Sequence, residues 1–549
     1  MTDQRIGAQA FLEQLIACGV EWIFGNPGTT EQTVIDYIQE YPQLGLILAL
    51  HEGVAVGAAD GYARACGRLG VVQLHAGPGL GNAIGNLYNA YISHTPMLVY
   101  VGQSPQRALY QEPVLSADLV AMGRPVTKWA YEVRTADEIP QVTRRAVKVA
   151  TTAPCGPVLL SIPLDLTDET CPAPVLPQEP ARNAVRPDPA AIAAAARALR
   201  SAVAPLVIAG DAVATSGAIE AVSGLARLLG APIMEGAAFE VVAAPEDPLL
   251  AGRVPASAAA AARLGAEHDV VVAIGTRVLA QVFPGDGAPL GDAAVIHIGA
   301  DDWELAKNQP SLVVRGDERA CVTELLAALG EGEGAPDNWR ARGAAAAARI
   351  GQQKAAALAA DRQAWDAVPM SPQRALAELA ANLPDGTCVI DEAMSSYEAA
   401  ARYLPKRPGA WFRGAGGIGM GLPRAVGAQL ADPGRPVVAV VGDGASMYSL
   451  TALWTAAHHH LPVTWVILAN RSYRTLKLNV AASRQPGAVG HQFIGADLTD
   501  PVVDFTALAA GFGVPAWRAE RPDQVGAAVN AAMASGGPAL IELIVNGGL

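Results

Sequence analysis

The chain has 549 residues, of which 51% are hydrophobic and 17% are charged, and its formal net charge is −13. This length is too great for one hydrophobic core and predicts about three domains, while the composition excludes a disordered chain. The negative charge argues against nucleic acid and anionic membranes as partners, and no apolar run reaches the roughly 18 residues that a membrane span needs. We therefore expect a globular cytoplasmic protein whose six scattered cysteines are reduced.

Two breaks divide the chain. Residues 168–189 are rich in proline and polar side chains, as an extended linker should be. Residues 330–370 pass from a Gly/Glu segment through an alanine-rich helical stretch to a proline. We therefore predict three domains, at residues 1–175, 186–335 and 365–549.

In the first domain an acidic residue follows a short apolar segment. Residues 46–50 are predicted to form a strand, and residues 53–64 a helix of small side chains, with Glu52 at the junction. Apolar surroundings at such a junction favour a carboxyl group that can hold a proton. The alternative is a first-turn acid that is favoured only by the helix dipole.

A histidine ends the next predicted strand of this domain. Residues 71–74 are apolar, and His75 follows them directly, before a Gly-Pro-Gly sequence at residues 77–79. A single histidine commonly has a structural role, but the carboxyl end of a buried strand suits a residue that takes part in chemistry.

The middle domain has the pattern of a Rossmann-like sheet. Its apolar strands, predicted at residues 205–210, 270–275 and 295–299, end in glycine and are separated by alanine-rich helices. No Gly-x-Gly-x-x-Gly motif follows any of them. Asp301 and Asp302 could cap a helix or contact a ligand, and capping is the favoured interpretation.

The third domain carries oxygen ligands after two buried strands. Residues 437–441 form an apolar run that leads into Gly-Asp-Gly at residues 442–444, and a helix is predicted from there through Leu450, Leu453 and Trp454. A second run, residues 463–468, delivers Asn470 to the same sheet edge, where open α/β sheets bind ligands. Oxygen ligands at a helix N-terminus suit Mg²⁺ and a phosphate group.

The first and third domains contain an internal repeat. Residues 71–79 lead through Leu87, Ala90 and His94 to Pro96, and residues 437–444 lead through the matching Leu453, Ala456 and His460 to Pro462, at one constant offset without gaps. Two domains of one fold are therefore predicted, although strand-turn-helix-strand units also resemble each other by chance. Only the third domain carries the Asp and the Asn.

The segment from Gly442 to Tyr473 resembles the motif of thiamine-diphosphate-dependent enzymes, in which Asn follows Gly-Asp-Gly at this distance. The resemblance covers nearly the whole chain and implies three α/β domains with doubly wound parallel sheets: pyrimidine-binding, Rossmann-like and diphosphate-binding. It implies thiamine diphosphate and Mg²⁺ as cofactors, with Ca²⁺ as a substitute. The implied metal ligands are Asp443, Asn470 and the carbonyl of Ser472. The implied cofactor contacts also include Gly442, Gly444, Ala445, Ser446 and Tyr473.

Other contacts carry over one residue at a time. The segment from His51 to Arg64 resembles the family's glutamate segment, in which Glu52 would hydrogen-bond N1′ of the aminopyrimidine. In the loop from Arg413 to Pro423, the Gly416 carbonyl would accept from the 4′-amino group, and Ile418 would bend the cofactor into a V shape. Ser395 is the expected diphosphate contact.

Within the family the resemblance is strongest to the benzoylformate decarboxylases. Residues 26–31, Asn-Pro-Gly-Thr-Thr-Glu, resemble their substrate loop, with Thr29 at a serine position, and His75 matches a catalytic histidine. A second active-site histidine of these enzymes would fall near Val282, where this sequence has none. Arg471 and Arg474 replace smaller residues and could bind an anion or remain solvated, with solvation favoured for Arg474.

The resemblance therefore implies decarboxylation of a 2-oxo acid, aromatic or bulky, to an aldehyde and CO₂, with carboligase activity possible at the same site. The alternatives are a carboligase that resembles the acetolactate synthases, and an inactive family member. Acetolactate synthases carry FAD on the middle domain, but no motif here demands it. Since the family's half-sites come from different subunits, we expect a homodimer or a homotetramer.

Overall fold

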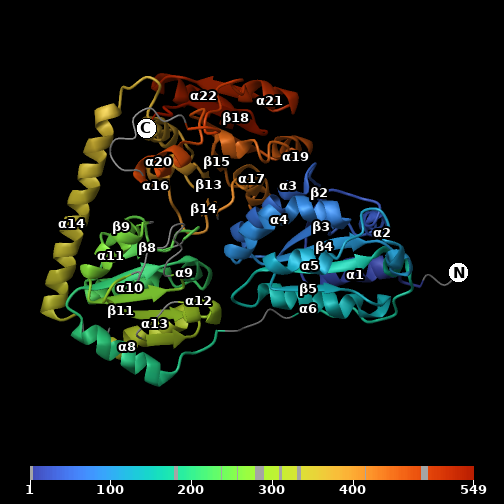
Figure 1. Ribbon diagram of the computed structural model, residues 1–549, viewed down its shortest axis with the longest axis horizontal. Coiled ribbons are helices and arrows are strands. Elements are labelled where there is room, and N and C mark those ends of the chain that lie inside the picture. Colours follow the sequence, from blue (N-terminus) through green and yellow to red (C-terminus); the bar gives the residue numbers. More distant parts are fainter. Residues whose placement is uncertain are drawn as a thin grey trace. The chain divides into compact units, whose positions relative to one another are not determined.

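The computed structural model describes residues 4–178, 184–236, 238–255, 257–277, 290–307, 312–330, 335–414, 416–483 and 493–548 (Figure 1). The chain forms an α/β protein with three six-stranded parallel sheets, as predicted. It divides into two compact units, one of Met1–Ala181, Trp365–Pro405 and Phe412–Leu549, the other of Arg182–Ala364 and Lys406–Trp411. No helix in the described part of the chain combines the length and apolar character that crossing a membrane requires.

The N-terminal lobe of the first unit, residues 4–178, surrounds a sheet of order β2-β1-β3-β4-β6-β5. Its strands are β1 (Trp22–Gly25), β2 (Gly45–Leu48), β3 (Gly70–His75), β4 (Met97–Gln103), β5 (Trp129–Glu132) and β6 (Pro157–Pro163). Its helices are α1 (Gly7–Ala17), α2 (Gln32–Ile38), α3 (Glu52–Cys66), α4 (Ala76–Ile92), α5 (Leu119–Gly123), α6 (Ile139–Thr151) and α7 (Leu164–Asp168), with short 3₁₀ turns η1 (Gln106–Gln111), η2 (Arg124–Val126) and η3 (Ala136–Glu138).

The C-terminal lobe of the same unit, which comprises its residues from 365 onward, contains a sheet of order β14-β13-β15-β16-β18-β17. Its strands are β13 (Cys388–Glu392), β14 (Trp411–Arg413), β15 (Val437–Gly442), β16 (Val463–Ala469), β17 (Ala516–Ala519) and β18 (Ala539–Ile544). Its helices are α15 (Pro372–Ala381), α16 (Tyr397–Tyr403), α17 (Gly421–Ala431), α18 (Asp443–Ser446), α19 (Ala452–His458), α20 (Arg474–Ser483), α21 (Phe505–Gly511) and α22 (Pro522–Ala534), with the 3₁₀ turn η6 (Met394–Ser396).

The internal repeat is confirmed at the level of topology. In both lobes the second strand lies at one edge, followed by the first, third, fourth, sixth and fifth. The backbone also matches at one position of the repeat, because His94 and His460 share a left-handed conformation with φ of 54°. The central strands β3 and β15 are buried along almost their whole length, as parallel strands covered on both faces should be.

The second unit contains a sheet of order β12-β11-β10-β7-β8-β9, which is the doubly wound arrangement predicted for the middle domain. Its strands are β7 (Pro205–Ala209), β8 (Ile233–Glu235), β9 (Leu250–Arg253), β10 (Val270–Ile274), β11 (Ala294–Gly299) and β12 (Leu312–Arg315). Its helices are α8 (Pro189–Ser201), α9 (Asp211–Thr215), α10 (Ile219–Leu229), α11 (Ala258–Ala266), α12 (Asp302–Lys307), α13 (Glu318–Leu329) and the long α14 (Asp337–Asp361), with the 3₁₀ turn η5 (Arg362–Ala364).

The carboxylate of Asp301 caps α12, because its Oδ1 accepts a hydrogen bond from the backbone N–H of Trp303 at 2.9 Å. The predicted capping role is therefore confirmed. His297 lies within β11 and is buried, with Nε2 3.0 Å from the carbonyl of Thr276.

Helices α3 and α17 join the two lobes by a close crossing in which glycines on each helix meet the backbone of the other. A Cβ atom at Gly61 would lie 2.0 Å from the carbonyl oxygen of Arg424, and one at Gly427 would lie 1.8 Å from that of Ala58. The contact is reciprocal, because residues 58 and 61 correspond to 424 and 427 at the same offset of 366 that relates Val71 to Val437. No side chain larger than hydrogen fits at either glycine.

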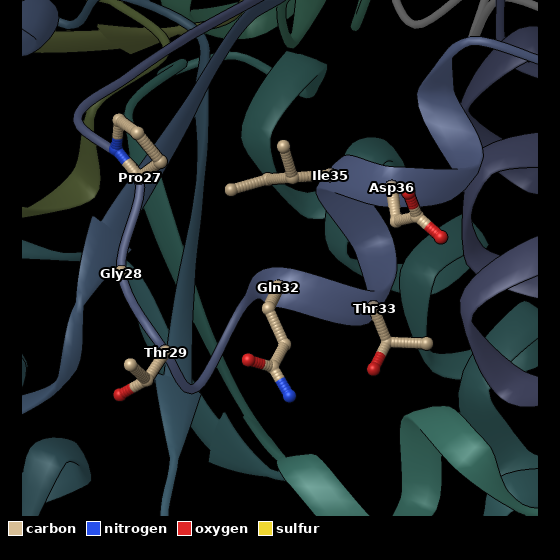
Figure 2. A pocket seen from close by; sticks show the side chains of 7 residues that line it. All are labelled: Pro27, Gly28, Thr29, Gln32, Thr33, Ile35 and Asp36. Carbon is tan, nitrogen blue, oxygen red and sulfur yellow. The ribbon is translucent and has the colours of Figure 1, made fainter.

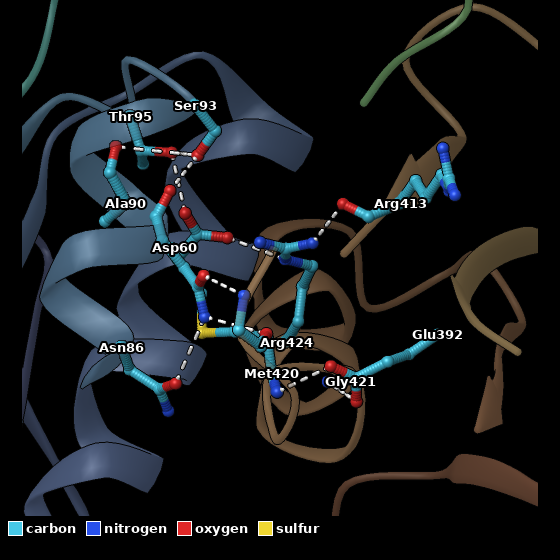
Figure 3. A network of polar contacts seen from close by, with 12 residues as sticks. Asp60, Asn86, Ala90, Ser93, Thr95, Glu392, Arg413, Met420, Gly421 and Arg424 are labelled. Carbon is cyan, nitrogen blue, oxygen red and sulfur yellow. Dashed lines mark hydrogen bonds and ion pairs between the residues drawn. The ribbon is translucent and has the colours of Figure 1, made fainter. Parts of the chain in front are cut away.

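A buried ion pair fixes the same crossing (Figure 3). Arg424 Nε donates to Asp60 Oδ2 at 2.6 Å, and both side chains are completely buried. The other oxygen of Asp60 accepts from Thr95 Oγ1 at 2.6 Å, and Arg424 Nη1 donates to the carbonyl of Arg413 at 2.6 Å. The pair thus connects α3, which begins at Glu52, with the segment that precedes α17.

A histidine makes a second contact between the lobes. The backbone N–H of Leu48, at the end of β2, donates to Nε2 of His459 at 2.9 Å, which requires that nitrogen to be unprotonated. Burial lowers the pKa of His459 from its usual 6.5, and the neighbouring His458 and His460 lower it further.

We therefore expect acid to destabilise the first unit through His459. Because the pKa is lower in the folded state, the unfolded chain binds a proton first, so the stability is full above about pH 6.5 and falls as the pH drops below it. Urea unfolding of the wild type and of His459→Gln, an amide that accepts a hydrogen bond without titrating, should diverge between pH 7.5 and 5.5. An equal loss of stability in the two proteins would contradict this assignment.

Candidate functional site

The C-terminal lobe brings the predicted oxygen ligands together at one sheet edge. Strands β15 and β16 pair in parallel, with Gly442 opposite Leu468, so Asp443 and Asn470 follow neighbouring strand ends. Asp443 Oδ1 accepts from the N–H of Gly444 at 2.8 Å, and Oδ2 accepts from the N–H of Arg471. The carboxylate therefore bridges the beginning of α18 and the loop after β16.

The amide of Asn470 is oriented by two contacts. Its Nδ2 donates to Ser395 Oγ at 3.2 Å, and its Oδ1 accepts from the N–H of Ser472 at 2.9 Å. Ser395, the predicted diphosphate contact, thus touches the predicted metal ligand. The ring of Tyr473 packs directly against Gly444, because a Cβ atom there would lie 2.5 Å from the ring.

This set of residues fits a hard divalent cation. Asp443 is buried, and burial raises the pKa of its carboxyl group to about 6, although hydrogen bonds from the backbone N–H groups of Gly444 and Arg471 act in the opposite direction. No group of three or more His, Cys, Asp or Glu side chains suitable for a metal occurs among the described residues. One carboxylate with neutral amide and carbonyl oxygens leaves positions for phosphate oxygens, as Mg²⁺ sites commonly do.

The helix predicted from Gly442 through Trp454 is wrong in one respect. The structure has two short helices, α18 and α19, separated by residues 447–451. The hydroxyl of Ser446 donates to the carbonyl of Asp443 at 2.7 Å, and Ser449 makes a tight backbone turn to Ser446. Side-chain and turn hydrogen bonds of this kind replace helical ones and end the first helix.

The two arginines after Asn470 are placed differently from each other. Arg471 has an exposed side chain, and its backbone N–H donates to Asp443 Oδ2. Arg474 is half-buried and donates from Nε to the carbonyl of Gly548 at 2.7 Å, so it holds the end of the chain. Sequence analysis favoured solvation for Arg474, and the structure adds a contact with the C-terminal segment that the sequence did not indicate.

Glu52 lies at the predicted junction, as the first residue of α3. His51 caps the helix, with Nδ1 accepting from the N–H of Gly53 at 3.0 Å. The Glu52 side chain is only 7% exposed, and Oε2 accepts from Nδ2 of Asn82 on α4 at 3.0 Å. A Cβ atom at Gly79 would lie 3.2 Å from Glu52 Oε1 and 3.4 Å from Cβ of His75, so these two residues flank the same turn of α4.

His75 has a buried acidic partner that the sequence did not identify as functional. Its Nδ1 lies 3.0 Å from Glu31 Oε2 and 3.1 Å from Thr30 Oγ1. Glu31 is completely buried, and burial raises its pKa although Thr30 and His75 oppose the shift. The carboxylate orients the ring with Nδ1 toward the protein and leaves Nε2 available for proton transfer.

Thr29 lies beside this pair without touching it. The threonine is exposed and lines an open hollow of about 730 Å³ at the loop before α2 (Figure 2). Gly28 lines the same hollow and packs directly against His75, because a Cβ atom there would lie 2.0 Å from the ring. The other lining residues are Pro27, Gln32, Thr33, Ile35 and Asp36.

The glycine loop before α17 carries two more predicted contacts. Gly416 is exposed with φ of 131°, a conformation that favours glycine, and Ile418 is half-buried. Asn89 on α4 binds both backbone groups of the intervening Gly417. Sequence analysis assigned no role to Asn82 or Asn89, although their spacing of seven places them on one face of α4.

Backbone strain is concentrated at the candidate site. Among the described residues, seven other than glycine have positive φ, and three of them, Ala76, Met394 and Arg471, adjoin His75, Ser395 and Asn470 respectively. Each lies just after a strand, where it turns the chain sharply toward the sheet edge.

The candidate residues form two groups within the first unit. Among the described residues, no hydrogen bond or ion pair joins the Glu52 and His75 group to the Asp443 and Asn470 group. Val282, near which the second family histidine would fall, lies outside the described residues.

Comparison with known proteins gave matches along the whole chain. Family models described as the N-terminal TPP binding, central and C-terminal TPP binding domains of thiamine pyrophosphate enzymes match residues 5–122, 192–325 and 393–543. Benzoylformate decarboxylase of Pseudomonas aeruginosa is 32% identical, with 96% of each chain covered. A probable acetolactate synthase large subunit of Methanocaldococcus jannaschii is 29% identical, with 98% of this chain and 92% of the relative covered. The solved structure of a thiamine diphosphate-dependent 4-hydroxybenzoylformate decarboxylase from Rhodococcus jostii has a TM-score of 0.85 at 28% identity. The match covers 98% of this chain and 99% of the solved chain.

Proposed function

Because the chain belongs to the thiamine pyrophosphate enzyme family, we propose that it uses thiamine diphosphate and Mg²⁺ to decarboxylate a 2-oxo acid, releasing an aldehyde and CO₂. The proposed substrate is an aromatic or similarly bulky 2-oxo acid of the benzoylformate type, with carboligation as a second reaction of the same site. The relative that is 32% identical and the solved 4-hydroxybenzoylformate decarboxylase support this choice.

One observation carries the proposal. The two lobes share one strand order but carry different side chains. In the C-terminal lobe, Asp443 and Asn470 follow the ends of neighbouring strands and offer oxygen ligands. In the N-terminal lobe, the buried Glu52 lies beside His75. An enzyme that uses this cofactor needs one group of residues to bind the metal and the diphosphate and another group to transfer protons. An inactive relative would not be expected to keep both.

We assign the binding of the cofactor as follows. Asp443, Asn470 and the carbonyl of Ser472 would hold Mg²⁺, and Ser395 with the backbone of residues 442–446 would hold the diphosphate. When bound, thiamine diphosphate supplies a nucleophilic carbon and an electron sink for the electrons that CO₂ leaves behind. Glu52 would share a proton with N1′ of the aminopyrimidine, and Asn82 keeps its carboxylate oriented for that exchange.

The other polar residues of the N-terminal lobe would act on the substrate. His75 would move a proton from Nε2 while Glu31 holds Nδ1 and stabilises the imidazolium form. Thr29, on the loop that lines the 730 Å³ hollow, would contact the substrate. Release of the aldehyde requires delivery of a proton. We propose His75 as the donor because Glu31 orients its ring.

The test is a panel of 2-oxo acids with thiamine diphosphate and Mg²⁺, in which CO₂ and aldehyde are measured separately. Benzoylformate and its ring-substituted analogues are expected to give equal amounts of CO₂ and aldehyde. Turnover of none of the 2-oxo acids would contradict the proposal.

A second candidate is a carboligase of the acetolactate synthase type. The probable acetolactate synthase large subunit matches 98% of the chain at nearly the same identity as the decarboxylase. The same panel separates the two candidates, because a carboligase would release CO₂ without a corresponding amount of aldehyde.

We also propose that the active form is at least a homodimer and that Glu52 of one chain acts with Asp443 of another. Large apolar side chains are exposed in both lobes, namely Tyr88 and Tyr91 on α4 and Met447, Tyr448 and Leu476 in the C-terminal lobe. Sedimentation of the active protein should give a dimer or a tetramer, and a fully active monomer would contradict the shared site.

A further inference from the structure

The glycine loop between β14 and α17 needs support from outside itself. Gly416 and Gly419 have φ values of 131° and 102°, which no helix or strand would impose. Ile418 lies between them and is half-buried. A loop with this backbone holds one shape only if other residues satisfy its N–H and C=O groups.

Glu392, the last residue of β13, binds three backbone N–H groups at the end of the glycine loop. Its Oε1 accepts from the N–H groups of Gly419 at 2.9 Å and Met420 at 3.1 Å, and its Oε2 accepts from that of Gly421 at 2.9 Å (Figure 3). The side chain is 2% exposed. Burial raises its pKa to about 7, while the three N–H donors and Arg424 act in the opposite direction.

Asn89 supports the loop from the other lobe. Its Oδ1 accepts from the N–H of Gly417 at 2.8 Å, and its Nδ2 donates to the carbonyl of the same residue at 3.0 Å. Asn89 is completely buried on α4. The two side chains therefore fasten Gly417 and Gly419, the residues immediately before and after Ile418.

We propose that Glu392 and Asn89 are positioning residues that set the glycine loop so that Gly416 and Ile418 meet the aminopyrimidine of the cofactor. This inference rests on the function proposed above. Neither side chain would touch the cofactor, since both are buried and their hydrogen-bonding atoms are directed at the loop backbone. Their effect passes through the shape of residues 416–421.

The chemistry of the loop demands a carboxylate at position 392. Three N–H donors face its two oxygens, so an amide in its place would direct an NH₂ group at one of these donors. A Cβ atom at Gly421 would lie 2.9 Å from Glu392 Oε2, so the loop backbone packs closely against this carboxylate. Glu392→Gln should therefore displace the loop without changing the size of the side chain.

Gln429 provides a matched control at the other end of α17. Its buried Nε2 donates to the carbonyl groups of Asp432, Pro433 and Arg435, at 3.3, 3.3 and 3.1 Å. Gln429→Leu removes three contacts between one side chain and a backbone loop, as a change at Glu392 does, but in a loop with no proposed cofactor contact.

The experiment measures the affinities of thiamine diphosphate and of its thiazole diphosphate fragment, which lacks the aminopyrimidine, each with Mg²⁺. Glu392→Gln and Asn89→Ala are expected to raise the Kd of thiamine diphosphate at least about tenfold and to leave that of the fragment within about twofold. Gln429→Leu is expected to change neither. Unchanged binding of thiamine diphosphate, or equal losses for both ligands, would overturn the inference.

One further measurement keeps the test decisive. In the wild type without cofactor, the amides of Gly417, Gly419, Met420 and Gly421 should be protected from hydrogen exchange, and free exchange would overturn the inference even if the variants fail to fold. A wild type that binds thiamine diphosphate while the variants bind it equally well refutes only the positioning role. A wild type that binds neither ligand refutes the proposed function itself.

Discussion

Replacing Glu52 by glutamine is expected to lower the rate of decarboxylation by about 10²–10⁴-fold, the usual contribution of a positioned acid or base. Glutamine has the shape of glutamate and its carbonyl can still accept from Asn82, so the fold of α3 should be unchanged. It cannot exchange a proton at pH 7. Single-turnover release of CO₂ at saturating thiamine diphosphate, with the affinity measured separately, checks this expectation.

Asn82→Ala is the matched control for that experiment. It leaves the Glu52 carboxyl group in place and removes only the hydrogen bond that orients it, so its loss of rate should be much smaller than that of Glu52→Gln. A Glu52→Gln variant that binds the cofactor and decarboxylates at the wild-type rate would contradict the proposed mechanism.

Replacing Arg424 by leucine is expected to destabilise the first unit by about 3–5 kcal/mol, because it leaves the carboxylate of Asp60 buried without its charge partner. The carbonyl of Arg413 also loses its donor. The effect should appear in urea unfolding as a transition at lower denaturant concentration. The activity should fall as well, since α3 carries Glu52 and α17 follows the glycine loop.

The double variant Asp60→Asn with Arg424→Leu separates charge burial from packing. The amide introduced at position 60 would keep an acceptor for Thr95 Oγ1 and would need no cation, so most of the lost stability should return. If the single and double variants unfold together, the loss comes from the missing volume of the arginine and the ion-pair explanation is wrong.

Much of the fold could be predicted from the sequence because its signals are local. The apolar runs at residues 71–74, 437–441 and 463–468 are buried parallel strands. The constant offset between the matching segments of the first and third domains predicted one topology for both lobes. The helix after Gly442 was predicted too long, since apolar spacing does not reveal the side-chain hydrogen bond of Ser446 that ends it.

The candidate site was predictable only where one motif carries one function. The motifs selected Glu52, Asp443 and Asn470 as candidates, but they did not indicate the contacting residues that come from distant segments. Asn82 and Glu31 lie 30 and 44 residues from the groups that they contact, and Asn89 lies 328 residues from Gly417. Such pairs depend on how strands are ordered and helices cross, which hydrophobic periodicity does not specify. The contact of Arg474 with the carbonyl of Gly548, 74 residues away, was not predicted for the same reason.

In the reciprocal crossing of α3 and α17, the two lobes of the first unit contact each other as the two copies in a dimer would, although they belong to one chain. Two copies of one ancestral domain would meet in this way, with each glycine resting on the partner's backbone. By the same offset of 366, Glu52 corresponds to Ile418 and Asp443 corresponds to Gly77. Under the function proposed above, the N-terminal lobe would move protons and the C-terminal lobe would hold the metal, so reverting a single residue would restore a complete site in neither lobe.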